Sequence, residues 1–187
     1  SSNNGGVKQS KNYARIVNSR HFERLKSLLD RTISFGDKVY MGGQTDSSSD
    51  FIEPTVLTDV KSESPIMSEE IFGPILPIIT YDEIDEVVQL INSNPKPLGL
   101  YIFSYNRKNI NFILNNTSAG GTSINDTILH YMHLNLPFGG INNSGFGRTH
   151  GEAGFKAFSN QRSILKQSRF SPMKLLYPPY TNGVKRM

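Results

Sequence analysis

Two short segments of the chain carry residue types that could bind a ligand. Residues 69–74 read Glu-Glu-Ile-Phe-Gly-Pro, so two carboxylates and an aromatic ring precede a Gly-Pro pair. Glycine allows unusual backbone angles and proline fixes its own, so the chain must turn at Gly73 and Pro74. Taken alone, this turn could simply join an acidic helical end to the apolar run that begins at Ile75.

The second segment, residues 137–147, reads Pro-Phe-Gly-Gly-Ile-Asn-Asn-Ser-Gly-Phe-Gly and could be mistaken for a phosphate-binding loop. A dinucleotide fingerprint needs a strand before it, a helix after it and an acid about 20 residues further on. The spacing fits poorly and no acid lies at that distance, so we reject a phosphate loop. The glycines are better explained by a sharp backbone turn beneath a pocket.

Other catalytic chemistries find weaker support. The four histidines include His130 and His133, which are three residues apart and could share a helix face as metal ligands. No third ligand has a compelling spacing, so no metal site is predicted. Ser144 lacks a histidine and an acid arranged as a triad. The chain has no cysteine, which excludes a thiolate nucleophile, disulfides and thiolate metal sites. No catalytic residue is therefore predicted.

The elements that must position these segments alternate between helices and strands. Asn18 or Ser19 can cap a helix, Asp82 can cap a second, and residues 110–114 supply a third. Strands are expected at residues 38–41, 51–57, 75–80, 98–104, 121–124 and 162–167, with Pro54 marking an edge or an irregular segment. This alternation predicts an α/β fold with a mostly parallel sheet flanked by helices.

The bulk composition is that of a soluble globular chain. Its 187 residues suit one domain with a real core, and 36% are hydrophobic and 19% charged. No apolar run approaches the roughly 18 to 20 residues needed to span a bilayer, and the polar start is no signal peptide. We expect a cytoplasmic or membrane-peripheral protein, with the compartment itself left open.

The net charge of +4 is unevenly spread, because no acidic residue follows Glu152. A basic tail can contact nucleic acid, anionic lipid or an acidic partner, and the alternative is a solvated surface or an inter-subunit strand. Nothing in the chain is typical of a single-strand platform or a major-groove helix, so we predict no nucleic-acid partner.

Residues 69–74 and 137–147 resemble two motifs of the aldehyde dehydrogenases, in the order and at the separation that family uses. Further similarities lie at residues 18–25, 54–60, 155–159 and 177–179, and the His150-Gly151 pair is typical of the class 3 branch. That branch includes the fatty aldehyde dehydrogenases. The resemblance spans roughly residues 7–180.

The resemblance implies a role for each matching residue. Glu70 would hydrogen-bond the nicotinamide ribose, since an ionised carboxylate accepts from both hydroxyls, and Phe72 would pack near the nicotinamide. Glu69 would be a surface acid. Phe138 would line the aldehyde tunnel. Three further residues resemble parts of the tunnel wall and mouth: Tyr131, Met132 and His150. Met132, followed by His133, departs from the small or hydroxylic wall residue usual there, which leaves the tunnel shape open.

The resemblance also implies what this chain does not supply. The catalytic cysteine, the general-base glutamate and the dinucleotide-binding half of these enzymes all lie upstream of the matched region. We therefore interpret the chain as the C-terminal part of an enzyme that oxidises aldehydes, medium- and long-chain ones included, to carboxylic acids with NAD or NADP. Alone it is expected to be inactive and to bind the cofactor weakly or not at all.

The expected organisation has three parts. Residues 1–12 form a disordered linker, residues 13–160 a partial catalytic domain, and residues 161–187 an oligomerisation strand with a basic extended tail. Homo-oligomers would form through residues 161–168, and membrane association would need a segment absent here. Two alternatives stay open. The chain could be an inactive binding or regulatory module that pairs with an intact subunit, or a purely structural piece whose strand near residues 162–167 extends a partner's sheet.

Overall fold

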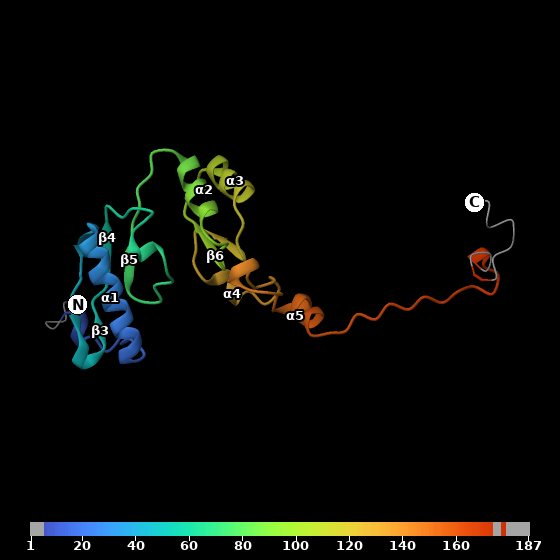
Figure 1. The fold of residues 1–187 in the computed structure, drawn as a ribbon, viewed down its shortest axis with the longest axis horizontal. Helices are drawn as coiled ribbons and strands as arrows, with labels where there is room; N and C mark the ends of the chain where they lie inside the picture. Colours follow the sequence, from blue (N-terminus) through green and yellow to red (C-terminus); the bar gives the residue numbers. More distant parts are fainter. Residues whose placement is uncertain (1–5, 174–176, 179–187) are drawn as a thin grey trace. The chain divides into compact units, whose positions relative to one another are not determined.

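The computed structural model describes residues 6–173 and 177–178 and divides into two compact units (Figure 1). Unit 1 holds the described residues up to Asn94 together with Asn106–Ser118. Unit 2 holds Pro95–Tyr105 and the described residues from Ala119 onward. The interval 13–160, expected as one partial domain, is thus shared between two units, because the chain passes from one to the other and back.

The first helix of unit 1, α1, covers Ser19–Phe35 and confirms the capping prediction. The Asn18 side chain accepts a hydrogen bond from the His21 amide, and Gly36 ends the helix in the left-handed region at φ 116°. Its apolar side chains recur at helical spacing and are buried: Phe22, Leu25, Leu28 and Leu29.

The strands of unit 1 form two small sheets. The three-stranded sheet has the order β1-β4-β5, from Lys38–Met41, Thr55–Thr58 and Ile75–Pro77. β4 runs antiparallel to β1 and parallel to β5. A separate antiparallel ribbon joins β2 (Thr45–Asp46) to β3 (Phe51–Ile52). The single, mostly parallel sheet expected from the sequence is therefore wrong in this unit.

The division of the expected strand 51–57 has a local cause. Glu53 and Pro54 lie between β3 and β4, and a proline has no amide hydrogen to give to a sheet ladder. The chain changes sheets at this point, so β3 pairs with β2 while β4 pairs with β1 and β5. The irregular segment predicted at Pro54 is confirmed.

The core of unit 1 forms where α1 lies against β3, β4 and β5 (Figure 1). The buried cluster joins the four helix residues to Ile52, Leu57, Val60, Ile66 and Ile75. Ile66 belongs to the short 3-10 helix η3, Pro65–Met67. Just before it, the buried Ser64 hydroxyl donates to the buried Asp37 carboxylate, which gives this polar pair the partners that burial requires.

Two more helices complete unit 1. α2 covers Ile84–Ser93 and α3 covers Arg107–Asn116. The prediction that Asp82 caps α2 is wrong: the N-cap is Glu83, which has extended backbone angles and makes no side-chain capping bond. The Asn92 amide donates to the Asn116 carbonyl at 2.8 Å and links the two helix ends.

Unit 2 is built on a parallel strand pair, β6 (Gly99–Ile102) and β7 (Gly121–Ile124), as the sequence predicts. Behind β7, the Asn125 side chain accepts from the Ser104 amide and donates to its carbonyl. Two short helices follow, α4 at Leu129–Met132 and α5 at Gly151–Ala157, with a 3-10 turn, η4, at Asn142–Ser144.

The N-terminal segment is ordered where it was expected to be a linker. Residues 1–5 lie outside the described residues, but Val7–Gln9 form a 3-10 turn, η1. The ammonium group of Lys8 pairs with the Asp46 carboxylate at 2.8 Å, and Arg15 donates to the Lys8 carbonyl. The linker prediction is therefore wrong from Val7 onward, because these contacts fix the segment on unit 1.

Acid is expected to weaken this attachment. Asp46 accepts hydrogen bonds from Lys8, Ser48 and Ser49, which hold the pKa of its carboxyl well below its usual range. A lowered pKa means that the stabilisation is complete above the ordinary aspartate value of about 3.9 and is lost as the pH falls below it. An NMR titration of Asp46 and Lys8 measures this, and Lys8→Gln should move the Asp46 midpoint upward. An unchanged midpoint would contradict the ion pair.

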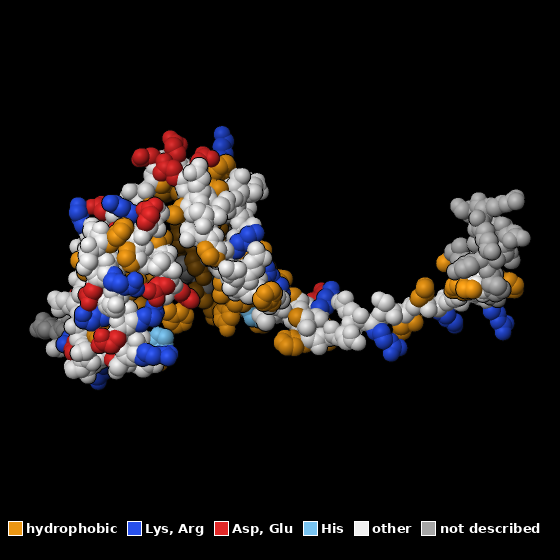
Figure 2. All heavy atoms as spheres, viewed as in Figure 1, with side chains coloured by type: hydrophobic (Ala, Val, Ile, Leu, Met, Phe, Trp, Pro, Cys, Tyr) orange, Lys and Arg blue, Asp and Glu red, His pale blue; other side chains and the backbone are white. Residues whose placement is uncertain are grey.

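Residues 161–168 are exposed and form no strand within a single chain. A strand needs a partner, so the oligomerisation strand stays a prediction. Figure 2 shows Lys, Arg and hydrophobic side chains along the segment that follows α5. In the part of the chain that the structure describes, no helix combines the length and the apolar character that crossing a bilayer requires. Pro179 and the rest of the predicted basic tail lie beyond these residues.

Candidate functional site

Glu70 and Phe72 lie together at the mouth of a cavity of about 680 Å³ in unit 1. Both side chains are exposed, and Phe72 is 85% exposed with a positive φ of 48°. An aromatic ring left in solvent on a left-handed backbone is unusual and points to a ligand-facing position. The cavity is lined by Arg15, Ile16, Val17, His21, Arg24, Glu69, Glu70 and Phe72.

The Gly-Pro turn brings this loop against α1. A Cβ atom at Gly73 would lie 2.6 Å from the Leu25 Cδ1 atom, so a larger residue here would force the Leu25 side chain to shift. Pro74 then accepts a hydrogen bond from the Thr55 amide at 2.8 Å, and β5 starts at Ile75. The loop that carries Glu70 and Phe72 is thereby tied to the sheet at its end.

Three cationic or titratable residues of this cavity were not predicted from the sequence: Arg15, His21 and Arg24. The helical phase set by the Asn18 cap places His21 and Arg24 on one face. Nothing in the sequence showed that this face meets a loop more than 40 residues away. The cavity thus combines a carboxylate, an exposed aromatic ring and cations, which suits a ligand with hydroxyls, a flat ring and negative charge.

The two carboxylates of the motif have different surroundings. Glu69 pairs with Arg24 at 3.0 Å and with Arg31 at 3.1 Å, so it is committed to the protein. Within the described residues the Glu70 side chain makes no such pair. Glu70 is therefore the carboxylate available to a ligand.

In unit 2 the structure brings together three of the four predicted tunnel residues. The ring centroid of Tyr131 lies 4.9 Å from that of Phe138 and 5.7 Å from that of His150. The rings of Phe138 and His150 stack at 6.0 Å. Met132, on the same short helix as Tyr131, is 65% exposed and takes no part in these ring contacts.

Two residues that the sequence did not indicate extend this aromatic cluster. The His130 ring lies 5.7 Å from the ring of Phe138 and 5.7 Å from that of Tyr101. Both ring nitrogens of His130 are shielded from solvent, and neither has a hydrogen-bond partner among the described residues. A Cβ at Gly121 would lie 2.7 Å from this ring, so the imidazole packs directly on the β7 backbone.

The glycine-rich segment holds Phe138 in place. Phe138 and Thr149 exchange two backbone hydrogen bonds of 3.2 and 2.7 Å, which set Phe138 beside His150. Between them the chain turns at Gly140, and the Ser144 hydroxyl accepts from the Ile141 amide and donates to the Ile141 carbonyl. Ser144 therefore closes a turn, and the sharp backbone turn predicted for this segment is confirmed.

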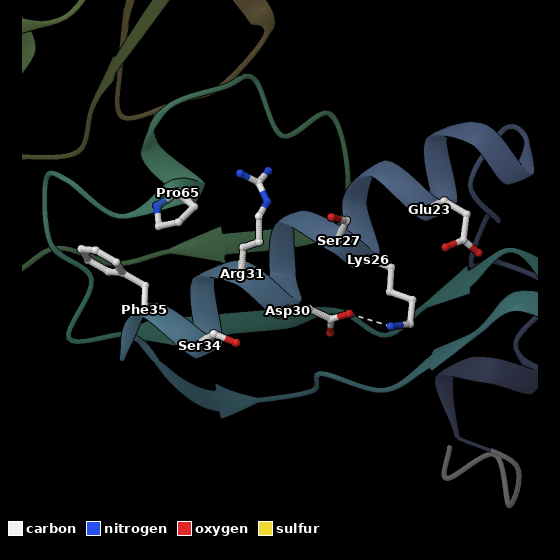
Figure 3. Close-up of a pocket in the computed structure, with 8 residues that line it drawn as sticks. All are labelled: Glu23, Lys26, Ser27, Asp30, Arg31, Ser34, Phe35 and Pro65. Atoms are coloured by element: carbon white, nitrogen blue, oxygen red, sulfur yellow. Dashed lines mark hydrogen bonds and ion pairs between the residues drawn. The ribbon is translucent and has the colours of Figure 1, made fainter.

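The other possible sites, a metal centre and two further cavities, contain none of the residues predicted to bind cofactor or substrate. Among the described residues, no three His, Asp or Glu side chains gather in a group that could hold a metal ion. Figure 3 shows a shallow cavity of about 580 Å³ along the outer face of α1, crossed by the Lys26–Asp30 ion pair of 2.6 Å. Another cavity, of about 530 Å³, lies beside α2.

Comparison with known proteins defines the class. The family model described as "Aldehyde dehydrogenase family" matches residues 4–164. The chain belongs to the aldehyde dehydrogenase family.

Its relatives include members of family 3. It is 47% identical over 175 residues to "Aldehyde dehydrogenase family 3 member A2" of Pongo abelii, covering 92% of this chain and 35% of that protein. It is also 47% identical to "Aldehyde dehydrogenase, dimeric NADP-preferring" of Rattus norvegicus, covering 92% of this chain and 38% of that protein. The chain thus spans little more than a third of these relatives' length.

Solved structures of aldehyde dehydrogenases superpose on this chain. A substrate-bound Staphylococcus aureus AldH superposes with a TM-score of 0.78 at 42% identity, covering 89% of this chain and 37% of that one. A Mycobacterium tuberculosis aldehyde dehydrogenase complexed with NAD+ superposes with a TM-score of 0.75 at 28% identity, covering 84% of this chain and 33% of that one.

Proposed function

We propose that this chain supplies the nicotinamide-ribose contact and the substrate-tunnel walls of an NAD- or NADP-dependent aldehyde dehydrogenase. The reaction is the oxidation of an aldehyde, medium- and long-chain aldehydes included, to a carboxylic acid. The observation that carries the proposal is the pairing of an uncommitted carboxylate, Glu70, with an exposed aromatic ring, Phe72, at one cavity. The relatives named for family 3 support the same branch.

The residues of the cavity suit the nicotinamide-ribose part of the cofactor. When bound, the nicotinamide would accept a hydride from the substrate carbon. Glu70 would accept hydrogen bonds from the two ribose hydroxyls, and Phe72 would offer its face to the flat ring. Arg15 and His21 lie on the cavity wall, where their N–H groups could donate hydrogen bonds to the bound cofactor.

The covalent steps need groups from outside this chain. In this family a cysteine thiolate adds to the aldehyde carbon, loss of hydride to a bound nicotinamide would convert that adduct to a thioester, and water activated by a glutamate would then cleave the thioester. This chain has no cysteine. Its own contribution is to orient the ribose, to exclude water and to hold the substrate.

The aromatic cluster of unit 2 supports an apolar substrate. Tyr131, Phe138 and His150 present ring faces and edges, with Met132 exposed beside them. Such walls bind an alkyl or aryl chain through apolar contact area, and they provide few groups that would hold a charged substrate.

NAD is expected to bind the isolated chain only in the millimolar range or weaker, which corresponds to about 4 kcal/mol at best. Glu70 contributes a ribose contact, while the adenine and phosphate sites of the family lie upstream of the matched region. Isothermal titration calorimetry measures the affinity, with Glu70→Gln as the variant that should weaken it further. Micromolar binding would mean that the chain holds a complete cofactor site.

The alternative function, an inactive module that assembles with an intact subunit, rests on one observation. Residues 161–168 expose Ile164 by 76% and Leu165 by 96%, and apolar side chains in so extended a segment suit pairing with another chain. The name of one relative, from Rattus norvegicus, describes that protein as dimeric. Self-association is compatible with either function.

We expect the chain to form dimers or larger assemblies through residues 161–168. In an extended strand the adjacent Ile164 and Leu165 would present one apolar side chain on each face, and the charges of Arg162 and Lys166 limit unwanted edge pairing. Light scattering gives the mass in solution. Ile164→Asp should shift the equilibrium to monomer, and Ser168→Asp, a change outside the apolar pair, should not. A wild-type monomer that Ile164→Asp leaves unchanged would defeat the assembly claim.

A further inference from the structure

One side chain holds the loop that carries Glu70 and Phe72. The guanidinium group of Arg24 donates to the Glu69 carboxylate at 3.0 Å, to the Glu70 carbonyl at 3.2 Å and to the Ile71 carbonyl at 2.7 Å. These acceptors are consecutive residues of the motif. Arg24 itself stands on α1 between the buried Phe22 and Leu25, so its backbone is fixed by the core.

We propose that Arg24 is the positioning residue for Glu70 and Phe72: it sets the backbone of the loop so that the carboxylate and the aromatic ring face the cavity. The inference rests on the proposed ribose role of Glu70 and deepens it. Arg24 acts through the loop backbone, so the residues that meet the ligand are still Glu70 and Phe72.

The loop has few other restraints. Among the described residues, its backbone hydrogen bonds lie at its two ends, where Ser68 donates to Pro65 and Thr55 donates to Pro74. Glu70 and Phe72 are exposed, so burial does not fix them, and Phe72 has a φ of 48° that an aromatic residue adopts only under restraint. Of the side chains between Glu69 and Pro74, that of Ile71 packs against the core cluster, and Gly73 approaches Leu25. The two carbonyl contacts of Arg24 lie on either side of that anchor.

The geometry requires an arginine. A guanidinium group has five donors in a rigid planar fork and can serve a carboxylate and two carbonyls at once. A lysine ammonium in the same place would keep the charge opposite Glu69 but would not hold the same three acceptors in fixed directions. Arg24→Lys therefore keeps the positive charge and removes the planar arrangement of donors, so it tests which of the two the loop needs.

Arg31 offers a matched control. It lies on the same helix (Figure 3) and pairs with the other oxygen of Glu69 at 3.1 Å. No backbone carbonyl of the loop accepts from it among the described residues. If the loop were positioned only by ion pairs to Glu69, replacing Arg24 and replacing Arg31 would have the same effect.

The first test measures order in the loop of the full chain. We expect the 15N order parameters of Glu70, Ile71 and Phe72 to fall from the rigid range near about 0.85 to below about 0.6 in Arg24→Lys and Arg24→Gln. Arg31→Gln should leave them unchanged, and all three variants should keep the α1 values. Order parameters that stay rigid in Arg24→Gln would overturn the proposal, as would an equal loss in Arg31→Gln.

The second test measures binding of nicotinamide mononucleotide by NMR titration at millimolar concentration. Arg24→Lys should weaken binding about fivefold to tenfold, where a tenfold change corresponds to about 1.4 kcal/mol. Arg31→Gln should weaken binding by less than about twofold. If Glu70→Gln weakens binding and Arg24→Lys does not, the loop is merely structural and the positioning role is wrong. If the wild type binds and Glu70→Gln has no effect, the ribose role itself is wrong, and the positioning role falls with it. If the wild type binds too weakly to measure, the order parameters of the first test decide the positioning role.

Discussion

The purified chain is expected to oxidise no aldehyde in the presence of NAD or NADP. A thiolate is a far stronger nucleophile than any hydroxyl in this chain, and the covalent step cannot be replaced by pocket walls. The chain has no cysteine, and the one serine in its glycine-rich motif, Ser144, is engaged with Ile141. Its arrangement leaves no group to form the thioester, so the expected loss relative to a complete enzyme is total.

The measurement is reduction of NAD and of NADP with short and long aldehydes, followed at 340 nm. Heat-denatured chain is the control for background reduction. Turnover by the native chain above that background would show that another nucleophile works in this fold. The absence of cysteine would then no longer be a reason to expect an inactive chain.

Inactivity alone does not separate a contributing part of an enzyme from an assembly module. The intact mass of the protein in its source cell does, because it shows directly which residues accompany this sequence. Binding of nicotinamide mononucleotide that depends on Glu70 would favour the enzymatic role. Association through Ile164 without any such binding would favour the module.

Local structure could be predicted well where a residue's chemistry acts on its nearest neighbours. Asn18 caps α1 and the apolar spacing behind it predicted the buried face, since both depend on helical geometry alone. The strand at Gly121–Ile124 was predicted with its observed bounds. At Pro54 the missing amide hydrogen indicated an irregular segment, but it could not tell which sheet each flanking strand would join.

The candidate site was harder because its contacts join distant parts of the chain. Arg24 meets its acceptors across 45 to 47 residues of sequence, and no pattern in either segment specifies that pairing. Glu70 and Phe72 could be named only through a family resemblance. The resemblance covered residues 18–25 but gave no role to His21 or Arg24, nor to Arg15, and all three entered through the packing of α1 against the loop.

The linker predicted at the start of the chain failed for a related reason. A polar, glycine-rich composition is typical of disorder when its charges have no partner. Here Lys8 finds Asp46, and the Tyr13 hydroxyl donates to the Ile52 carbonyl at 2.8 Å, so the segment is held by contacts that composition cannot reveal.

Gly140→Ala is expected to disrupt the glycine-rich turn and to destabilise unit 2 by about 3 kcal/mol, near the upper end for overpacking. A Cβ at Gly140 would lie 2.1 Å from the carbonyl carbon and oxygen of Ser144. These are backbone atoms, so no flexible side chain can move aside. Gly140 is also buried, and its carbonyl accepts a hydrogen bond from Arg148, so the turn cannot shift without losing that contact.

The matched control is Gly154→Ala in α5. Its new Cβ would meet the Thr149 carbonyl carbon at 3.4 Å, an ordinary contact, and alanine lowers the entropy of the unfolded chain. Gly154→Ala should therefore be neutral or stabilising by about 0.4 to 1 kcal/mol. The two variants make the same chemical change in the same unit and differ in what the added methyl group meets.

The readout is local as well as global. Chemical denaturation gives the change in unfolding free energy, and the ring-proton shifts of His150 report its stacking on Phe138, whose centroid lies 6.0 Å away. Gly140→Ala should move the His150 signals toward free histidine, since Phe138 is held by the turn that the methyl group breaks. Gly154→Ala should leave them in place. If both variants retain native stability and shifts, the glycines of this motif are not needed for close backbone approach, and the account of how Phe138 is positioned is wrong.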